Sequence, residues 1–141
     1  MKRMLTTILL IGIIFSCSGT VSAIEIQPYR ESPTLASYAA KLYTGSGKSE
    51  IIVSYEVNAS RWADSIGVER IRFYTEDGEL VSTVYGTISN GLVYSDYSFH
   101  MGDFNYELPS GDYYYAKVTV FAEYNGVYDS RTVTTNTVWV R

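Results

Sequence analysis

Apolar and polar residues alternate with a period of two along most of the chain. The clearest stretch is residues 50–58, where one face of the alternation is apolar: Ile51, Val53, Tyr55 and Val57. Residues 68–74 repeat the pattern, with Ile71 and Phe73 on the apolar face. Such alternation is typical of half-buried β-strands. The pattern therefore predicts an antiparallel, all-β protein.

Turn residues separate the predicted strands. Glu76-Asp77-Gly78 leads into a strand over 80–85, which predicts a β-hairpin, and Asn90-Gly91 predicts a second turn. Residues 92–108 alternate less regularly, and we expect two short strands there, broken near Gly102.

The segment 35–43 allows two interpretations. Leu35, Ala39 and Leu42 recur at helical spacing after Ser32-Pro33, a pair that can begin a helix. However, the segment is short and ends in a glycine-containing loop, so we predict a first strand and keep a helix as the alternative.

Three consecutive tyrosines stand at the start of the strand predicted over 112–124. Alternation places Tyr114 on the core face with four small or aliphatic residues: Ala116, Val118, Val120 and Ala122. Tyr113 and Tyr115 face the other way, toward either a neighbouring strand or solvent.

Asn125-Gly126 is a strong signal for a two-residue hairpin loop. This loop pairs Tyr124 with Val127, and the same register carries Asp129 and Arg131 to the core face. Burying these charges is costly unless they pair, so we predict a β-bulge near 129–131. A final strand is expected over 132–140.

About seven strands follow from these patterns. Leu108, Gly111 and Tyr114 resemble the tyrosine corner of immunoglobulin-like and fibronectin type III-like domains, which implies an antiparallel β-sandwich with Tyr114 in a structural role. The stretches IGVERIRFYTEDGELVSTVYG and GDYYYAKVTVFAEYNG resemble a group of small secreted proteins of Gram-positive bacteria, a resemblance that implies no activity.

The first 23 residues predict a secretory signal peptide. Lys2 and Arg3 precede the mostly apolar run 5–15, and Val21-Ser22-Ala23 offers a cleavage site. Alternatively, the residues before Cys17 resemble a bacterial lipoprotein box, which implies a lipid anchor and a surface location. Cleavage after Ala23 leaves 24–141 as one secreted domain with no cysteine and hence no disulfide.

Removing Lys2 and Arg3 takes the formal net charge from −4 to −6. An acidic domain argues against nucleic acid, whose affinity comes largely from basic contacts to phosphate. Arg70 and Arg72 flank Ile71, which is typical of a solvated strand face.

Catalytic and metal-binding signals are weak. His100 is the one histidine, and we expect it in a solvated loop, where Asp103 orients it only if a turn folds back. We therefore predict no enzyme, no metal and no cofactor. Calcium is the alternative, because four aspartates fall at predicted loops or strand ends: Asp96, Asp103, Asp112 and Asp129.

We expect a secreted, non-catalytic interaction module, of adhesive or surface-associated type, with a protein or glycan partner. The alternative is a carbohydrate or cell-wall binding module, and a small extracellular enzyme is a second alternative. The candidate ligand residues are the aromatics least suited to burial: Trp62, Tyr97, Tyr113 and Tyr115. Trp62 is expected between two strands, where it can also act as a lid on the end of the sandwich.

Overall fold

The computed structural model describes residues 34–141, so the predicted signal peptide and Cys17 lie outside the described residues. This part of the chain forms seven strands: β1 (Leu35–Thr44), β2 (Glu50–Thr75), β3 (Leu80–Tyr85), β4 (Val93–Glu107), β5 (Asp112–Tyr124), β6 (Val127–Thr134) and β7 (Val138–Val140). Within 34–141 no helix is long and apolar enough to cross a membrane.

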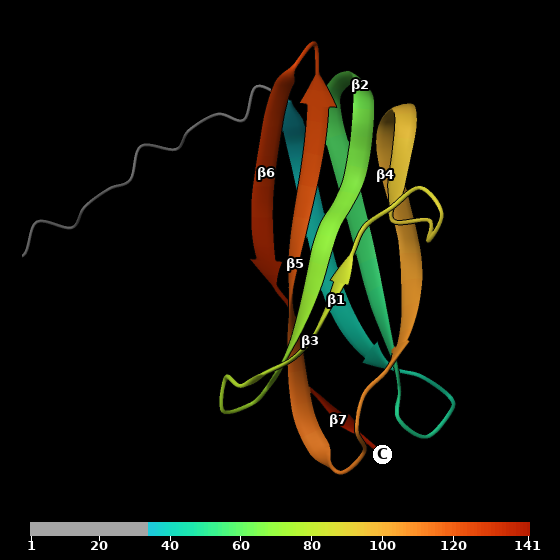
Figure 1. The fold of residues 1–141 in the computed structure, drawn as a ribbon, viewed down its shortest axis with the longest axis vertical. Coiled ribbons are helices and arrows are strands. Elements are labelled where there is room, and N and C mark those ends of the chain that lie inside the picture. The colour runs from blue at the N-terminus through green and yellow to red at the C-terminus, as the bar shows by residue number, and fades with distance from the viewer. Residues whose placement is uncertain (1–33) are drawn as a thin grey trace, which may run out of the picture.

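All seven strands belong to one antiparallel sheet. Its main order is β1-β2-β5-β6, with β3 and β4 also paired to β2, and β7 paired to β5. Figure 1 shows the sheet curling back on itself, so that β1 and the first half of β2 lie behind β5 and the second half of β2. The predicted all-β, antiparallel class with seven strands is confirmed.

The 26-residue strand β2 joins the two halves of the molecule. Its first half pairs with β1, its second half pairs with β5 and β3, and β4 pairs along β2 from Glu50 to Gly67. Between Asn58, opposite Phe99, and Ala63, opposite Tyr97, four residues of β2 face one residue of β4. This bulge bends β2 without ending it. The prediction that Trp62 lies between two strands is therefore wrong.

The inner face of the sheet carries the core. The alternation predicted for β2 and β5 is confirmed, because all the predicted inward residues are buried: Ile51, Val53, Tyr55, Val57, Ile71, Phe73, Tyr114, Ala116, Val118, Val120 and Ala122. Strand β1 confirms the predicted strand over 35–43, and its buried Leu42 joins the same core. Leu108 is also buried, and Gly111 has a φ of +91° in the turn before β5.

Strand β4 is continuous, so the predicted break near Gly102 is wrong. Gly102 lies directly opposite Tyr55 of β2. A Cβ atom at this position would stand 2.8 Å from the Tyr55 hydroxyl oxygen, too close for a real side chain. The glycine therefore makes room for a buried phenol.

The β5–β6 hairpin follows the predicted register without interruption from Tyr124 opposite Val127 to Lys117 opposite Thr134. The predicted bulge at 129–131 is therefore wrong. Asp129 is buried as expected, and its carboxylate Oδ1 lies 2.7 Å from Nη1 of Arg131. Because the two charges pair on the same face, the register needs no shift.

The predicted last strand is two strands, β6 and β7. Between them, Thr135 bonds to Ala116 through both its backbone N–H and its hydroxyl oxygen. The Asn136 side chain then accepts a hydrogen bond from the Leu42 N–H of β1 and donates one to the Leu42 carbonyl, each at 2.9 Å. One side-chain amide thus links β1 to the segment between β6 and β7, across the curl of the sheet.

Candidate functional site: an aromatic surface at the bend of β2

Three exposed aromatic rings gather where β2 bends. Trp62 of β2 is 62% exposed and stacks on Tyr97 of β4, which is 52% exposed, with ring centroids 6.1 Å apart. Tyr94 of β4 lies 5.7 Å from Tyr97, at an angle of 54°. The bulge in β2 brings Trp62 toward β4, because Tyr97 pairs with the next residue, Ala63. We call Trp62, Tyr94 and Tyr97 the aromatic surface.

The ring contacts continue from this surface into the core. Tyr94 stacks on His100 with centroids 4.2 Å apart, and His100 meets Tyr55 edge-on at 5.2 Å. His100 and Tyr55 are both buried. Five rings from β2 and β4 are therefore in consecutive contact, from solvent to the interior.

The Gly91 carbonyl oxygen ties the inner end of this row to the β3–β4 loop. It accepts a hydrogen bond from the Tyr55 hydroxyl at 3.2 Å and lies 3.0 Å from His100 Nε2. A carbonyl oxygen can only accept, so a hydrogen bond from His100 to Gly91 requires the tautomer with its proton on Nε2, which also lies 3.1 Å from the Tyr55 hydroxyl. Gly91 has a φ of +77°, a conformation that suits glycine at this turn.

Burial shifts both buried groups toward their neutral forms. Loss of solvation is the main cause that raises the pKa of Tyr55 to about 12, with smaller contributions from Tyr94 and Asp103. Burial also lowers the pKa of His100 below its usual value, against the opposing effect of its hydrogen bond to Gly91. At neutral pH the inner cluster is therefore an uncharged imidazole against a protonated phenol.

The structure brings together only some of the predicted ligand residues. Trp62 and Tyr97 meet, whereas Tyr113 packs edge-on against Trp139 and Tyr115 stacks on Tyr74. The bend of β2 lies at the same end of the molecule as the β5–β6 hairpin, while β7 and the start of β5 lie at the opposite end (Figure 1). The four predicted residues therefore do not form one surface.

Sequence reasoning missed Tyr94 and Trp139 as partners in these pairs. Tyr94 has the pattern of an ordinary strand residue, and its ring contacts with Tyr97 and His100 become visible only in the folded structure. The only sequence signal for Trp139 is its aromatic ring. It lies opposite Tyr113 because β6 ends before it and the separate strand β7 pairs with β5, which the residue pattern does not reveal.

His100 is buried in strand β4, so the expectation of a solvated loop histidine is wrong. Asp103 does not orient it, because residues three apart on a strand point to opposite faces. His100 lies inside opposite Val57, whereas Asp103 is exposed opposite Ser54.

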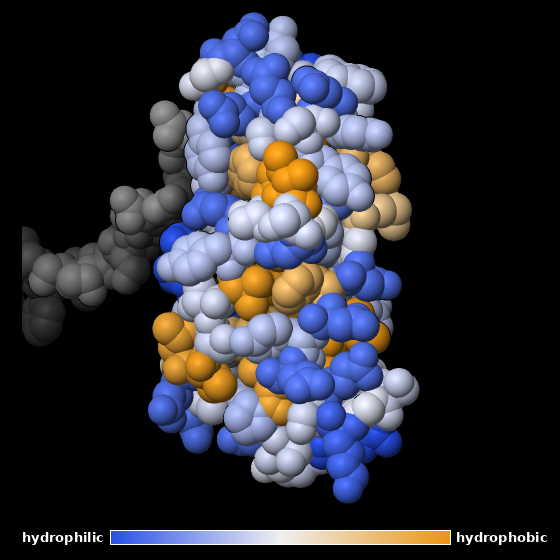
Figure 2. All heavy atoms as spheres, turned by 45° about the vertical axis from the view of Figure 1, so that its right-hand side comes forward, coloured by the Kyte–Doolittle hydropathy of each residue, from blue (hydrophilic) through white to orange (hydrophobic). Residues whose placement is uncertain are grey.

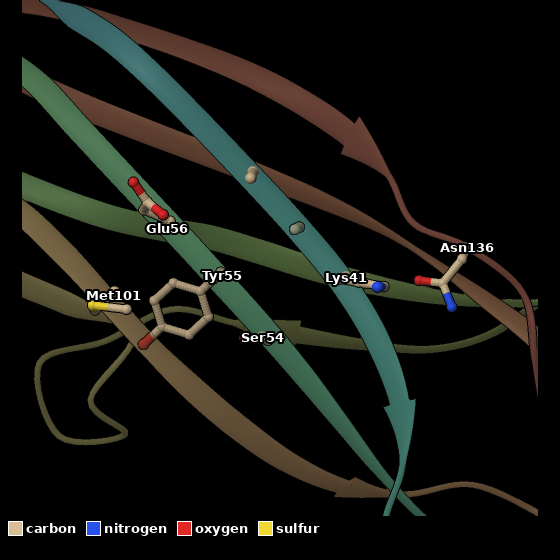
Figure 3. A pocket seen from close by; sticks show the side chains of 8 residues that line it. Lys41, Ser54, Tyr55, Glu56, Met101 and Asn136 are labelled. Carbon is tan, nitrogen blue, oxygen red and sulfur yellow. The ribbon is translucent and has the colours of Figure 1, made fainter.

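A groove of about 400 Å³ crosses β1, β2 and β4 (Figure 3). Its two charged side chains already have partners: Lys41 Nζ lies 5.1 Å from the ring centre of Tyr43, and Glu56 accepts a hydrogen bond from Asn58 at 2.7 Å. Across residues 34–141, no three His, Cys, Asp or Glu side chains are placed to hold a metal ion.

Comparisons with known proteins place the chain in no family: no protein-family model matches it, and no curated protein matches it. Among solved structures, the crystal structure of a family 76 glycoside hydrolase from a bovine Bacteroides thetaiotaomicron strain is similar, with a TM-score of 0.45 and 17% identity. The likeness covers 75% of this chain and 20% of that one. A similarity at this level carries no argument about function.

Proposed function

We propose that the protein is a secreted, non-catalytic binding module whose aromatic surface binds carbohydrate. The observation that carries the proposal is the contiguous row of exposed rings Trp62, Tyr97 and Tyr94. Sugar rings present apolar C–H faces, which pack against exposed aromatic rings. Trp and Tyr also supply large contact areas at low cost in conformational entropy.

The buried side chains of His100 and Tyr55, the inner pair, support this surface. His100 stacks under Tyr94 and is itself fixed by the Gly91 carbonyl and the Tyr55 ring. A ring held from below loses less freedom when a ligand arrives, so the surface is preorganised. Polar atoms near the bend, such as the carboxylate of Asp64 that accepts the Asn125 N–H at 2.7 Å, hold the adjoining hairpin in place.

The fold proposed for this module is a fibronectin type III-like sandwich. The distribution of the pairings is in line with it: β2 pairs with β1 and most of β4 before its bulge and with β3 and β5 after it, and only residues 65–67 of β2 pair with both β4 and β5. In this interpretation two strands of the usual sandwich are fused into β2. The buried Tyr114, after the Gly111 turn at the start of β5, is the counterpart of the tyrosine corner.

A protein partner is the second candidate. Strand β6 ends the sheet order and contains neither lysine nor proline, so its protection against edge pairing comes from the charges of Asp129 and Arg131, which pair with each other. An extended peptide can add to such an edge. Against a broad apolar interface, Figure 2 shows the apolar residues on the visible side as separate islands among polar ones.

The test is a binding screen of the purified protein against an array of glycans and cell-wall polysaccharides. Trp62→Ala and Tyr97→Ala are compared with Tyr43→Ala, a similarly exposed tyrosine outside the aromatic surface. We expect binding that both surface variants lose and the control retains, with all three folded by circular dichroism. Binding that Tyr43→Ala loses equally, or no glycan binding at all, contradicts the proposal.

A further inference from the structure

The chain contains the dipeptide Asn-Gly twice, at 90–91 and at 125–126. The first pair lies in the turn between β3 and β4, and the second forms the tip of the β5–β6 hairpin. Asn90 and Asn125 are both exposed, and the φ angles of Gly91 and Gly126 are similar, +77° and +75°. The two turns therefore present the same chemical group to solvent, and they differ in how it is held.

Asn-Gly is the dipeptide most prone to spontaneous deamidation, the reaction that makes asparagine a thermolabile residue. The backbone nitrogen of the glycine attacks the asparagine Cγ, and a five-membered succinimide ring closes. Glycine favours this step because it has no side chain to hinder the approach. The reaction needs only water and freedom for that nitrogen to reach that carbon, so local hydrogen bonds decide which pair reacts.

Asn90 is locked on both sides of the reaction. Its Oδ1 accepts two backbone N–H groups, at 2.9 Å and 3.2 Å, and its Nδ2 donates to the Tyr85 carbonyl at 2.8 Å. The attacking atom is held as well, because Gly91 N donates to the Ile88 carbonyl at 3.2 Å. Moving the Gly91 nitrogen onto Cγ of Asn90 would therefore break several hydrogen bonds at once.

Asn125 is held much less firmly. Among residues 34–141, its side-chain amide has no hydrogen-bond partner, and neither has the backbone nitrogen of Gly126. The Asn125 N–H donates to Asp64 Oδ2 at 2.7 Å, but neither of the two reacting atoms takes part in that bond. Exposed loop tips also open more easily than the strands they join. A small movement of this tip can therefore bring the Gly126 nitrogen to Cγ of Asn125.

We propose that Asn125 is the site at which the folded protein deamidates, and that its turn protects Asn90. The Gly126 nitrogen forms a bond to Cγ of Asn125, the bond from Cγ to Nδ2 breaks, and the Gly126 N–H proton leaves with Nδ2 as ammonia. Water then opens the ring. Its attack at Cγ restores the main chain with aspartate at 125, and its attack at the backbone carbonyl carbon leaves isoaspartate, in which the main chain runs through Cβ and Cγ.

Both products change the charge where the hairpin meets the bend of β2 (Figure 1). Each adds one negative charge to a chain whose formal net charge is −4. The new carboxylate belongs to the residue whose N–H is already bonded to the Asp64 carboxylate. Arg61 is a cation at the same place, with its guanidinium 5.1 Å from the ring centre of Tyr124. Isoaspartate also lengthens the turn by one main-chain carbon.

The experiment incubates the full protein at mildly alkaline pH, digests samples over time and follows both Asn-Gly peptides by mass spectrometry. We expect aspartate and isoaspartate to accumulate at least about tenfold faster at 125 than at 90, because reaction at Asn90 first breaks several hydrogen bonds. In urea neither turn is held, and the two sites should react at similar rates.

Two matched variants assign the charge change in the intact protein. Asn125→Gln should prevent most of the acidic species that ion exchange detects, because glutamine closes the larger ring far more slowly. Asn90→Gln, checked for folding by circular dichroism, should leave that species unchanged. Three results would overturn the proposal: reaction at 90 as fast as at 125 in the folded protein, protection of both sites until urea is added, or a tenfold difference that persists in urea.

Discussion

Tyr55 and Trp62 lie seven residues apart on the same strand and end in opposite environments. Tyr55 packs with His100 as an inner pair, buried and hydrogen-bonded to the Gly91 carbonyl. Trp62 packs with Tyr97 as an outer pair, exposed on both rings. The two pairs are joined through Tyr94, which contacts His100 and Tyr97.

The difference lies in what each ring needs from the protein. A buried phenol or imidazole requires an internal hydrogen-bond partner, and the turn at Gly91 supplies one. An exposed ring has water for its polar atom and can leave one face free for a ligand. We infer that the inner pair builds the fold and that the outer pair is available for binding.

The largest expected effect is on stability at the inner pair. Tyr55→Ala should lower the free energy of unfolding by about 3–5 kcal/mol, because it leaves a cavity beside His100. Trp62→Ala should change it by only about 0.5 kcal/mol, since the indole is mostly exposed. Urea denaturation followed by circular dichroism measures both, and equal losses would break the comparison.

Gly102 tests the space around the Tyr55 hydroxyl. Gly102→Ala should cost about 1–3 kcal/mol, because the new methyl group meets that oxygen at 2.8 Å. In a Tyr55→Phe background the oxygen is gone, and the cost should be smaller. A double-mutant cycle measures this coupling. Additive losses would show that the methyl group and the hydroxyl do not meet.

The inner pair should also make stability depend on pH. The pKa of His100 is lowered in the folded protein, so below about pH 6.5 the unfolded chain binds a proton that the folded chain does not. The free energy of unfolding should therefore fall on acidification from pH 6.5 toward pH 5, by at most about 1.4 kcal/mol per pH unit. His100 is the chain's one histidine. His100→Gln should flatten this slope, and an unchanged slope in that variant would assign it to other groups.

The smallest effect is expected at the far end of the molecule. Tyr113→Ala removes a ring that packs on Trp139, away from the bend of β2. Glycan binding by this variant should equal that of the parent protein in the same array measurement. A loss as large as that of Tyr97→Ala would place the ligand on Tyr113 instead.

Much of the fold could be predicted from residue patterns, because burial on one face of a strand imposes a period of two. This applies to the inward residues of β2 and β5 and to the Asn125-Gly126 hairpin, whose backbone carries the positive φ angles that such a loop needs. The predicted bulge at 129–131 was wrong because alternation cannot show that Asp129 and Arg131 pair with each other.

The candidate site was harder to predict, since it depends on contacts between distant residues. The bulge that brings Trp62 to Tyr97 leaves β2 continuous, and no local signal marks it. Gly102 has the composition of a strand breaker, yet its missing side chain makes room for the opposing Tyr55 hydroxyl. His100 was predicted to be solvated because its partner, the Gly91 carbonyl, belongs to a turn nine residues earlier. Residue type identified two members of the aromatic surface, and only the fold adds Tyr94.

Fluorescence of Trp62 tests the central claim most directly. The chain has two tryptophans, so Trp139→Phe leaves Trp62 as the single reporter. Titrating this protein with the glycan selected on the array should shift or quench the emission along a saturable curve, and adding Tyr97→Ala should abolish the change. Saturable binding by calorimetry with no change in Trp62 emission would contradict the account, because the ligand would then lie elsewhere.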